Sequence, residues 1–379
     1  MKPANGIRER IIREQRIVRR VPLVNGLISY LNPLRNIAGL IMSEFRSGVN
    51  LSFRHTLRAW RSGFTRSSYR MYGMEQSGNP DDYISDYEAL RQMNINGSFT
   101  EMISNKLFFS LLMKEHGIPT PKIYGVIHKG FFYSTGPEGA MGPSEFLKAV
   151  SRPGERIVLK PLRAWHGHGL LMVAQNDSGF LINGESVTLD ELIGIISKID
   201  NYLAVEFVTQ GEYGALLYPH TTNTVRVITL LDSDTSAPFI ARVVQRIGTS
   251  RSYPVDNFKG GRGGLSAEVD PDSGELGLAA MADDEGHLTW HSSHPETNAG
   301  IKGAVVPHWG EIRRNILEYA GRLAFVPFIA WDIVPTLSGF SIIEGNPMSG
   351  MTVIQVHGPM LADSRIRRFC RSHGVIKRQ

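Results

Sequence analysis

The chain has a single cysteine, Cys370, among its 379 residues, so no disulfide can form within it. This scarcity excludes a disulfide framework and favours a reducing compartment. Glycine and proline are spread along the chain, with no low-complexity tract and no internal repeat. We expect no catalytic role for Cys370, because no ordered base partner is evident for it. A hydrophobic content of 42% is enough for one large or two medium folded domains.

The chain also lacks an uninterrupted apolar segment of membrane-spanning length near its start. The stretch 21–45 is apolar, but Asn32, Pro33 and Arg35 interrupt it. It lacks the small-residue cleavage pattern of a signal peptide. We therefore expect a cytoplasmic protein, with peripheral attachment at the inner membrane face as the alternative.

Acidic residues are scarce at the N-terminus. Residues 1–70 hold 14 Lys and Arg against 3 Asp and Glu, a net charge of +11 in a chain of net +5. Apolar residues recur among the first arginines with the spacing of an amphipathic helix. This basic region is expected either to pack on the rest of the protein or to bind an anionic membrane surface or an acidic glycan. Nucleic acid is not expected as a partner, because no recognised nucleic-acid motif accompanies the charge.

Two apolar segments near the C-terminus are separated by a tight Ser-Gly turn. Residues 328–334 and 340–344 have the composition of paired β-strands. In such a hairpin Asp332 and Glu344 lie on neighbouring strands and point the same way, and Asn346 follows on the same face. Two carboxylates and an amide oxygen suit Mg²⁺ when phosphate oxygens supply its remaining ligands. The alternative is a surface hairpin with solvated acids.

A second pair of apolar segments flanks a loop with two glycines. The run 156–161 carries Lys160 near its end, the loop holds Gly167 and Gly169, and residues 170–173 are apolar again. The glycines let the backbone approach a ligand and present N–H groups to an anion. Lys160 supplies a point charge for a phosphate oxygen. Taken alone, the loop also fits an ordinary hairpin turn.

A third strand-like segment, 202–206, ends in Glu206, and Glu212 lies in the polar turn that follows. The chain thus has, in order, an early lysine at Lys106, Lys160 with its glycine loop, a strand ending in an acid, and the terminal set of two acids and an asparagine. In this order and spacing the sequence resembles the ATP-grasp superfamily.

Further segments narrow the resemblance. The run 104–109, the Gly-Ile-Pro-Thr-Pro segment at 117–121, the strand-like run 223–229 and the glycine-rich segment 256–264 are similar to the sugar-transfer-associated ATP-grasp family, which is related to α-L-glutamate ligases. The resemblance covers about residues 80–365. It implies a link to surface-polysaccharide biosynthesis.

The resemblance also implies roles for individual residues. The lysines hold phosphates, the backbone after the third strand reads the adenine edge, and the second acid holds the ribose hydroxyls. The ATP-binding residues implied are Lys106, Lys160, His166, Gly167, His168, Gly169, Glu206, Phe207, Val208 and Glu212. The metal-binding residues implied are Asp332, Glu344 and Asn346, for Mg²⁺ with Mn²⁺ as an alternative. The two loop histidines are not expected to bind the metal, because Mg²⁺ prefers oxygen.

Arg226 lies in the middle of a predicted strand, where alternation turns it to the side opposite the flanking valines. A charge on an inward strand face is rarely left unpaired. Arg226 either pairs with one of the two acids as scaffold or stabilises oxyanion charge on the γ-phosphate or a tetrahedral intermediate. Arg242, in the neighbouring strand 240–244, is a second candidate, and with Lys160 these residues form the predicted catalytic set.

The fold class expected is α+β: an ATP-grasp fold, in which two α+β lobes clasp ATP, preceded by a helical region. We expect a basic helical region over 1–90, the small nucleotide-binding lobe over 91–209, and the large lobe with the metal site over 210–379. Residues 1–100 show no convincing strand–helix alternation, so the Rossmann-like domain that opens many ATP-grasp ligases is not expected.

The activity implied by the resemblance is ATP- and Mg²⁺-dependent carboxylate–amine ligation through an acyl phosphate, with small-molecule carboxylate and amine substrates. This chemistry requires no nucleophilic side chain. Two alternatives remain: a kinase that phosphorylates a hydroxyl acceptor, and a non-catalytic ATP-binding protein associated with a membrane or a glycan.

Overall fold

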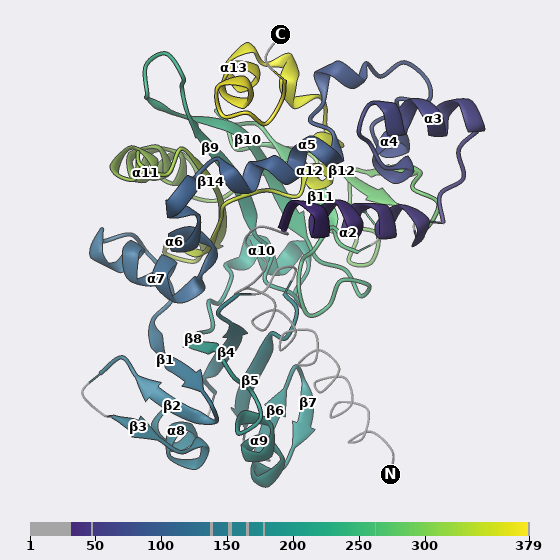
Figure 1. The fold of residues 1–379 in the computed structure, drawn as a ribbon. Helices are drawn as coiled ribbons and strands as arrows, with labels where there is room; N and C mark the ends of the chain where they lie inside the picture. The colour runs from purple at the N-terminus through teal and green to yellow at the C-terminus, as the bar shows by residue number, and fades with distance from the viewer. Residues whose placement is uncertain are drawn as a thin grey trace. The chain divides into compact units, whose positions relative to one another are not determined.

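The computed structural model describes residues 32–46, 48–136, 139–150, 154–163, 167–176, 179–261 and 263–377 (Figure 1). The described residues form two compact units. One consists of residues 105–208, and the other combines residues 32–104 with residues 209–377. Among the described residues no helix is long and apolar enough to cross a membrane.

The unit of residues 105–208 is built on an antiparallel sheet with the strand order β3-β2-β1-β8-β4-β5-β6-β7. Its strands are β1 (Ile123–His128), β2 (Phe131–Ser134), β3 (Ala140–Met141), β4 (Arg156–Pro161), β5 (Leu171–Asn176), β6 (Gly179–Ile182), β7 (Glu185–Val187) and β8 (Tyr202–Glu206). Its helices are α7 (Lys106–Glu115), α8 (Pro143–Val150) and α9 (Leu189–Ile196). Apolar residues of α8 and α9, such as Phe146 and Leu192, pack with Ile157 and Leu159 of β4 to form its core.

The second unit contains another antiparallel sheet, ordered β13-β12-β11-β10-β9-β14-β15. Its strands are β9 (Val225–Leu231), β10 (Pro238–Ile247), β11 (Leu265–Val269), β12 (Leu276–Ala282), β13 (Leu288–His291), β14 (Phe328–Thr336) and β15 (Gly339–Asn346). Its α-helices are α2 (Asn32–Arg46), α3 (Phe53–Arg61), α4 (Arg66–Met71), α5 (Asp86–Ala89), α6 (Thr100–Ser104), α10 (Glu212–Leu217), α11 (Trp309–Arg322), α12 (Met351–Gln355) and α13 (Ser364–Ser372). Short 3₁₀ turns are η1 (Pro80–Asp82), η2 (Leu90–Asn94), η3 (Gly97–Phe99) and η4 (Met360–Ala362).

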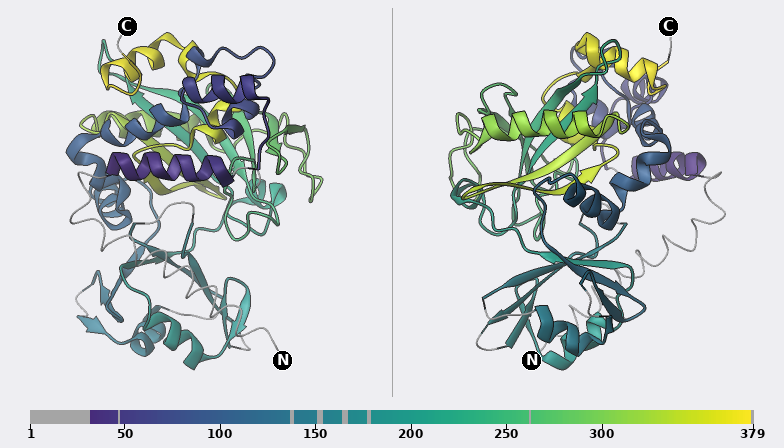
Figure 2. Two further views of the ribbon diagram at one scale, coloured as in Figure 1. Left: turned by 45° about the vertical axis from the view of Figure 1, so that its right-hand side comes forward. Right: turned by 90° about the vertical axis from the view of Figure 1, so that its left-hand side faces the viewer.

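Residues 32–104 share a core with the C-terminal part of the chain. The Gln355 side chain donates to the carbonyl of Ile84 and accepts from its N–H, both at 2.9 Å. The Asn96 side chain makes the same kind of paired contact with the backbone of Phe328 on β14. Figure 2 shows the purple and blue helices of this segment beside the yellow C-terminal helices in both views. Residues 32–104 therefore belong to the same compact unit as the second sheet.

The secondary structure around the predicted motifs agrees with the sequence patterns. The hairpin predicted at 328–344 is β14 and β15, and a helix begins at Lys106, where Asn105 caps it by accepting from the N–H of Leu107. The fold class, with helices and two antiparallel sheets, is confirmed.

Candidate functional site

The acids predicted to bind a metal lie directly opposite each other on β14 and β15. The register pairs Asp332 with Glu344 and Ala330 with Asn346, so the three polar side chains share one face of the sheet. The Asn346 amide nitrogen lies 3.4 Å from Oδ2 of Asp332 and donates to it. Asp332 is buried, whereas Glu344 and Asn346 are half-buried. The hairpin therefore places these three side chains on one face, as the sequence pattern predicted.

Arg226 approaches the same carboxylate from the other side of β14. It lies on β9 in register with Asp332, and its Nε and Nη2 donate to Oδ1 and Oδ2 at 2.7 and 2.6 Å. This two-point contact is the strong form of an arginine–carboxylate pair. Burial lowers the pKa of Arg226, but the neighbouring Asp332 carboxylate outweighs burial, and the pKa is raised. Arg226 therefore stays charged.

A second arginine, Arg246 of β10, extends this group. Its Nη1 donates to Oδ2 of Asp332 at 3.2 Å, and its Nη2 donates to Oδ1 of Asp256 at 2.5 Å and to the side-chain oxygen of Asn257. Oδ2 of Asp256 accepts from the N–H and the hydroxyl of Thr224. We did not predict Arg246. The sequence feature that could have indicated it is its position four residues after Arg242 in the same strand.

The two guanidinium groups keep Asp332 ionised. Burial raises the pKa of this carboxyl, but Arg226 and Arg246 together outweigh burial and lower it. Among the described bonds, Oδ1 accepts from one donor and Oδ2 from three. A carboxylate oxygen has two lone pairs, so Oδ1 retains one toward a cation. With the oxygens of Glu344 and Asn346, this donor set has the chemistry that Mg²⁺ prefers.

Arg242 lies apart from this group. Its Nη2 donates to the carbonyl of Pro359 at 3.2 Å. The charged group next to it is Glu268, whose pKa is raised chiefly by burial and lowered in part by Arg242. The register of β10 shifts between Ile240 and Arg242. Arg246, rather than Arg242, is therefore the β10 arginine that contacts Asp332.

The glycine-rich segment after β10 holds Asp256 and Asn257 against Arg246. Gly263 and Gly264 donate to Phe258 and Asn257 carbonyls at 3.1 and 2.7 Å. A Cβ on Gly264 would lie 2.4 Å from the carbonyl oxygen of Ile247, so only glycine fits. Both glycines are buried. Arg262, in the same segment, lies outside the described residues.

In the unit of residues 105–208, the two predicted phosphate lysines come from neighbouring elements. Lys160 lies near the end of β4, opposite Leu203 of β8. Lys106 is the first residue of α7, and its N–H donates at 3.1 Å to the carbonyl of Leu162, two residues beyond Lys160. Both lysine side chains are buried. A buried lysine needs an anionic or hydrogen-bonding environment, which suits a phosphate role.

The predicted glycine loop begins after β4. Gly167 and Gly169 have φ values of +66° and +76°, which favour glycine over any other residue. His168, between them, is exposed. His166 lies outside the described residues, so its predicted contact with ATP stays a prediction.

Backbone hydrogen bonds hold the end of β8, which is predicted to contact the adenine. The N–H of Glu206 donates to the carbonyl of Lys122 at 2.9 Å, and that of Phe207 donates to the carbonyl of Arg156 at 3.2 Å. The Arg156 guanidinium lies 3.8 Å from the centre of the Phe207 ring. Val208 is the last residue of this unit.

Glu212 belongs to the second unit, where it is exposed and begins α10. The ATP-binding residues implied by the resemblance therefore come from both units.

A cavity of about 710 Å³ lies in the unit of residues 105–208, between α7, β1 and β2. Its lining includes Lys114, Lys122 and Tyr124, but none of the residues that we predicted to bind ATP. This cavity is therefore distinct from the residues predicted to bind ATP.

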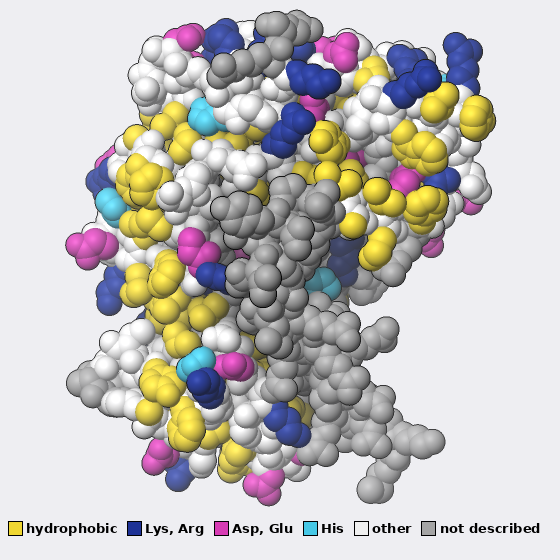
Figure 3. Space-filling view, viewed as in Figure 1, with side chains coloured by type: hydrophobic (Ala, Val, Ile, Leu, Met, Phe, Trp, Pro, Cys, Tyr) yellow, Lys and Arg dark blue, Asp and Glu magenta, His cyan; other side chains and the backbone are white. Residues whose placement is uncertain are grey.

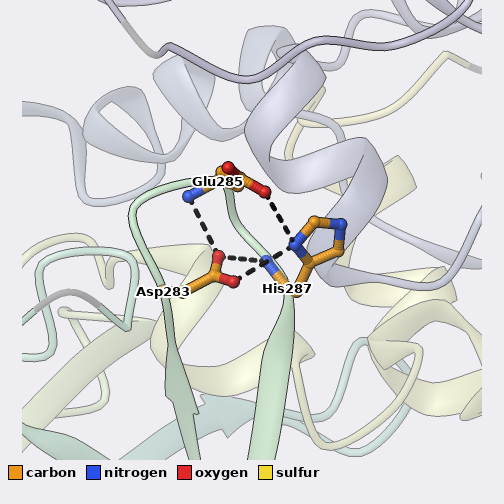
Figure 4. Close-up of side chains that lie close together, drawn as sticks. All are labelled: Asp283, Glu285 and His287. Atoms are coloured by element: carbon orange, nitrogen blue, oxygen red, sulfur yellow. Dashed lines mark hydrogen bonds and ion pairs between the residues drawn. The ribbon is translucent and has the colours of Figure 1, made fainter.

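A separate acidic group lies on the turn between β12 and β13. One ligand-type atom each of Asp283, Glu285 and His287 lies within 4.8 Å of the others, and all three residues are exposed (Figure 4). Oδ1 of Asp283 accepts from the N–H groups of Glu285 and His287, both at 2.9 Å. The N–H of His287 is the main cause of the lowered pKa of Asp283. These bonds are those of an aspartate that stabilises a tight turn, and we read the group as structural.

Cys370 is buried on α13, and burial raises its pKa to about 12. A thiol in such surroundings is unreactive.

Comparison with solved structures found matches of low similarity. D-alanyl-alanine synthetase A from Vibrio cholerae is 14% identical, with a TM-score of 0.40 over 73% of this chain and 66% of that one. D-alanine–D-alanine ligase from Bacillus anthracis is 13% identical, with a TM-score of 0.37 over 79% and 78%. N5-carboxyaminoimidazole ribonucleotide synthetase from Thermus thermophilus is 15% identical, with a TM-score of 0.35 over 66% and 46%, so the match spans less than half of that enzyme.

A search of curated proteins found no match to the chain. The sequence model described as sugar-transfer associated ATP-grasp matches residues 86–371, which is most of the chain. The match includes both lysines, the glycine loop, the two arginines and the opposed acids. The chain therefore belongs to the sugar-transfer-associated ATP-grasp family.

Proposed function

We propose that this protein is an ATP- and Mg²⁺-dependent ligase that joins a carboxylate to an amine. Family membership supports ligase-type activity in general terms. The observation that carries the proposal is the set of Asp332, Glu344 and Asn346 on one sheet face. Within this set, Asp332 accepts hydrogen bonds from Arg226 and Arg246. The two arginines keep a carboxylate ionised and orient it beside two further oxygen donors, as a phosphate-bound divalent cation requires.

Each group of residues has a role in this proposal. Asp332, Glu344 and Asn346 hold the metal, which when bound neutralises phosphate charge and orients the γ-phosphoryl group. Lys106 and Lys160 hold phosphate oxygens, and the backbone of the Gly167–Gly169 loop covers them. The backbone at Glu206–Val208 binds the adenine, and Glu212 binds the ribose.

The proposed reaction has two steps. An oxygen of the substrate carboxylate attacks the γ-phosphorus and ADP leaves, which forms an acyl phosphate. The amine then attacks the acyl carbon and loses a proton to solvent, and phosphate leaves with the C–O bonding pair, so that an amide remains. Two of the three guanidinium nitrogens of Arg226 donate to Asp332. Its Nη1 is the group proposed to stabilise the tetrahedral oxyanion.

The proposed biosynthetic role and substrate classes rest on the family's association with sugar transfer. We propose a role in the biosynthesis of a surface polysaccharide or a related conjugate of sugar and amino acid, in the cytoplasm or at the inner membrane face. Uronic acids, amino sugars and amino acids are then the substrate classes to test. The metal is proposed to be Mg²⁺, and Mn²⁺ has the same preference for oxygen.

The proposal is tested by phosphate and ADP release from Mg²⁺-ATP across pairs of these carboxylates and amines. Amine-dependent phosphate release by the wild type is expected, with a loss of about 100-fold or more in Glu344→Gln, because the variant removes a metal ligand. Glu318→Gln on α11 is the control, since this exposed acid forms an ion pair with a surface arginine, Arg322.

Hydroxylamine distinguishes the ligase from the two alternatives. An acyl phosphate is trapped as a hydroxamate, whereas a phosphorylated hydroxyl is not. A stable phosphorylated acceptor without hydroxamate would replace the ligase proposal with the kinase. Binding of ATP without turnover for any pair would favour the non-catalytic interpretation.

A further inference from the structure

A solvent-facing surface of large apolar and basic side chains lies on α2 and α3, far from the groups discussed above in sequence. Its apolar members are Ile41, Met42, Phe45, Phe53, Leu57 and Trp60, and its basic members are Arg54, Arg58 and Arg61. We call these nine residues the α2–α3 surface. Figure 3 shows apolar side chains gathered over these helices, with basic side chains beside them. Phe53 and Phe45 are 85% and 76% exposed, which is unusual for residues of this size.

The geometry of α3 explains why both kinds of side chain face solvent. Phe53, Leu57 and Trp60 have the i, i+4, i+7 spacing of one helical stripe, and the three arginines form the adjacent stripe. Ala59, between the far edges of these stripes, is fully buried and is the residue that faces the core. The helix therefore uses a narrow face for packing and leaves its large side chains outside.

One contact ties the two helices of the surface together. The indole Nε1 of Trp60 donates to Oε1 of Glu44 on α2 at 2.9 Å, while half of the Trp60 side chain stays exposed. The same carboxylate accepts from Nε of Arg66 and is buried. The ring of Trp60 is thus held in place with its apolar part toward solvent, which is the orientation of a tryptophan at a membrane interface.

The charge of the surface is of one sign. Residues 45–74 contain no Asp or Glu and six arginines. Arg66 and Arg70 pair with Glu44 and Glu75, but no ion pair within the described part of the chain includes the three arginines of α3. An apolar surface edged by exposed cations is complementary to an anionic lipid surface, where the rings enter the headgroup layer and the arginines meet phosphates.

The net charge of the N-terminal segment is positive, like that of the α2–α3 surface. Residues 1–30 contain seven Lys and Arg against two Glu, a net charge of +5. A second copy brings the same positive surface. Repulsion between like charges disfavours both the N-terminal segment and a second copy as the group that covers this surface. The observations therefore favour a partner outside the chain, with negative charges at its surface and an apolar layer below them.

We propose that the α2–α3 surface docks the protein on an anionic lipid bilayer. The proposal does not rest on the ligase assignment, because none of its residues belongs to the proposed ATP or metal groups.

The test is flotation of the full-length protein with phosphatidylcholine vesicles, with or without about one-third phosphatidylglycerol, which supplies the surface potential. The wild type is expected to float with the anionic vesicles only, and less as salt rises. The triple variant Arg54→Gln, Arg58→Gln, Arg61→Gln is expected to bind about 100-fold more weakly, at about fivefold for each arginine. Phe53→Ser is expected to lose about tenfold, because a large ring no longer enters the interface.

Matched controls lie on the same unit. The triple variant Lys302→Gln, Arg313→Gln, Arg314→Gln removes the same charge from another exposed region. Leu337→Ser removes an apolar side chain that is 74% exposed on the β14–β15 turn. Both controls are expected to float like the wild type. Equal flotation of the control and α2–α3 variants, or no flotation of the wild type, overturns the proposal.

Trp60 provides a second measurement. Lipids brominated on the acyl chain are expected to quench part of the tryptophan fluorescence of the wild type and less of it in Trp60→Phe. A soluble polyuronate that binds the wild type but not the arginine variant, and binds Phe53→Ser unchanged, would identify an acidic glycan and refute lipid docking. Circular dichroism of each variant separates these results from loss of folding.

Discussion

At the residue scale, the charge on Asp332 depends on neighbours that are distant in sequence. Arg226 is 106 positions away and Arg246 is 86 positions away, yet both donate to this carboxylate. Arg246 also holds Asp256, whose pKa is raised chiefly by burial and lowered in part by Arg246. One guanidinium thus serves two buried carboxylates, so its removal affects both.

We predict that Arg246→Met lowers the free energy of unfolding by about 3–5 kcal/mol, because buried Asp256 loses its partner. Urea unfolding measures this, with Arg322→Met, which removes an exposed i,i+4 pair, as the control at about 0.5 kcal/mol or less. Adding Asp256→Asn to Arg246→Met is expected to restore part of the loss, since no buried charge then remains unpaired at this position. A loss equal to that of the control would show that Arg246 does not support the group.

At the element scale, the segment 256–264 is packed onto β10 through glycines. Gly264 approaches the backbone of Ile247 so closely that a side chain has no room, and the neighbour is a carbonyl that cannot rotate away. This approach lets Asp256 and Asn257 reach Arg246 from a segment without regular structure. The glycines therefore act on the candidate site through the backbone.

We predict that Gly264→Ala destabilises the protein by about 1–3 kcal/mol, because the methyl group forces the segment away from β10. Gly300→Ala is the matched control: a Cβ there meets nothing within 4 Å, so the expected change is within about 0.5 kcal/mol. Thermal unfolding of both variants measures the difference. Equal melting temperatures would mean that the segment relaxes without cost.

At the scale of the whole molecule, the proposed ligand groups are divided between the two units. Lys106, Lys160 and Glu206 belong to residues 105–208, whereas Asp332 and Glu344 belong to the other unit. Because a ligand that binds only the folded state stabilises it, nucleotide binding is measurable without any acceptor substrate.

We predict that Mg²⁺-ATP at about 100 times its Kd stabilises the wild type by about 2.7 kcal/mol. Lys160→Met, in one unit, and Glu344→Gln, in the other, are each expected to lose most of this stabilisation. Chelation of Mg²⁺ is expected to reduce the effect in the wild type but to change little in Glu344→Gln. Differential scanning fluorimetry measures the shift in melting temperature. Lys148→Met and Glu318→Gln, both at exposed positions, are the controls. An undiminished shift in both site variants would contradict the assigned roles.

Local patterns carried much of the prediction. The apolar composition of 328–334 and 340–344 and the turn between them were enough to predict the hairpin and to turn Asp332 and Glu344 the same way. The structure adds that the two residues pair directly, because the register of an antiparallel hairpin fixes which residues face each other. Asn105, which caps α7 by accepting from the N–H of Leu107, is a local feature of the same kind, since a helix start depends on adjacent residues. The order of the motifs along the chain was sufficient for the family and the fold class.

The sequence by itself determined these local elements and the order of their motifs, because each depends on residues close together in the chain. The tertiary structure alone decided that Arg246 rather than Arg242 meets Asp332, and that buried Asp256 and Asn257 hold Arg246. It also decided that residues 32–104 belong to the same compact unit as the second sheet. These outcomes depend on strand register across β9, β10 and β14 and on close backbone packing between distant segments, neither of which leaves a periodic pattern in the sequence.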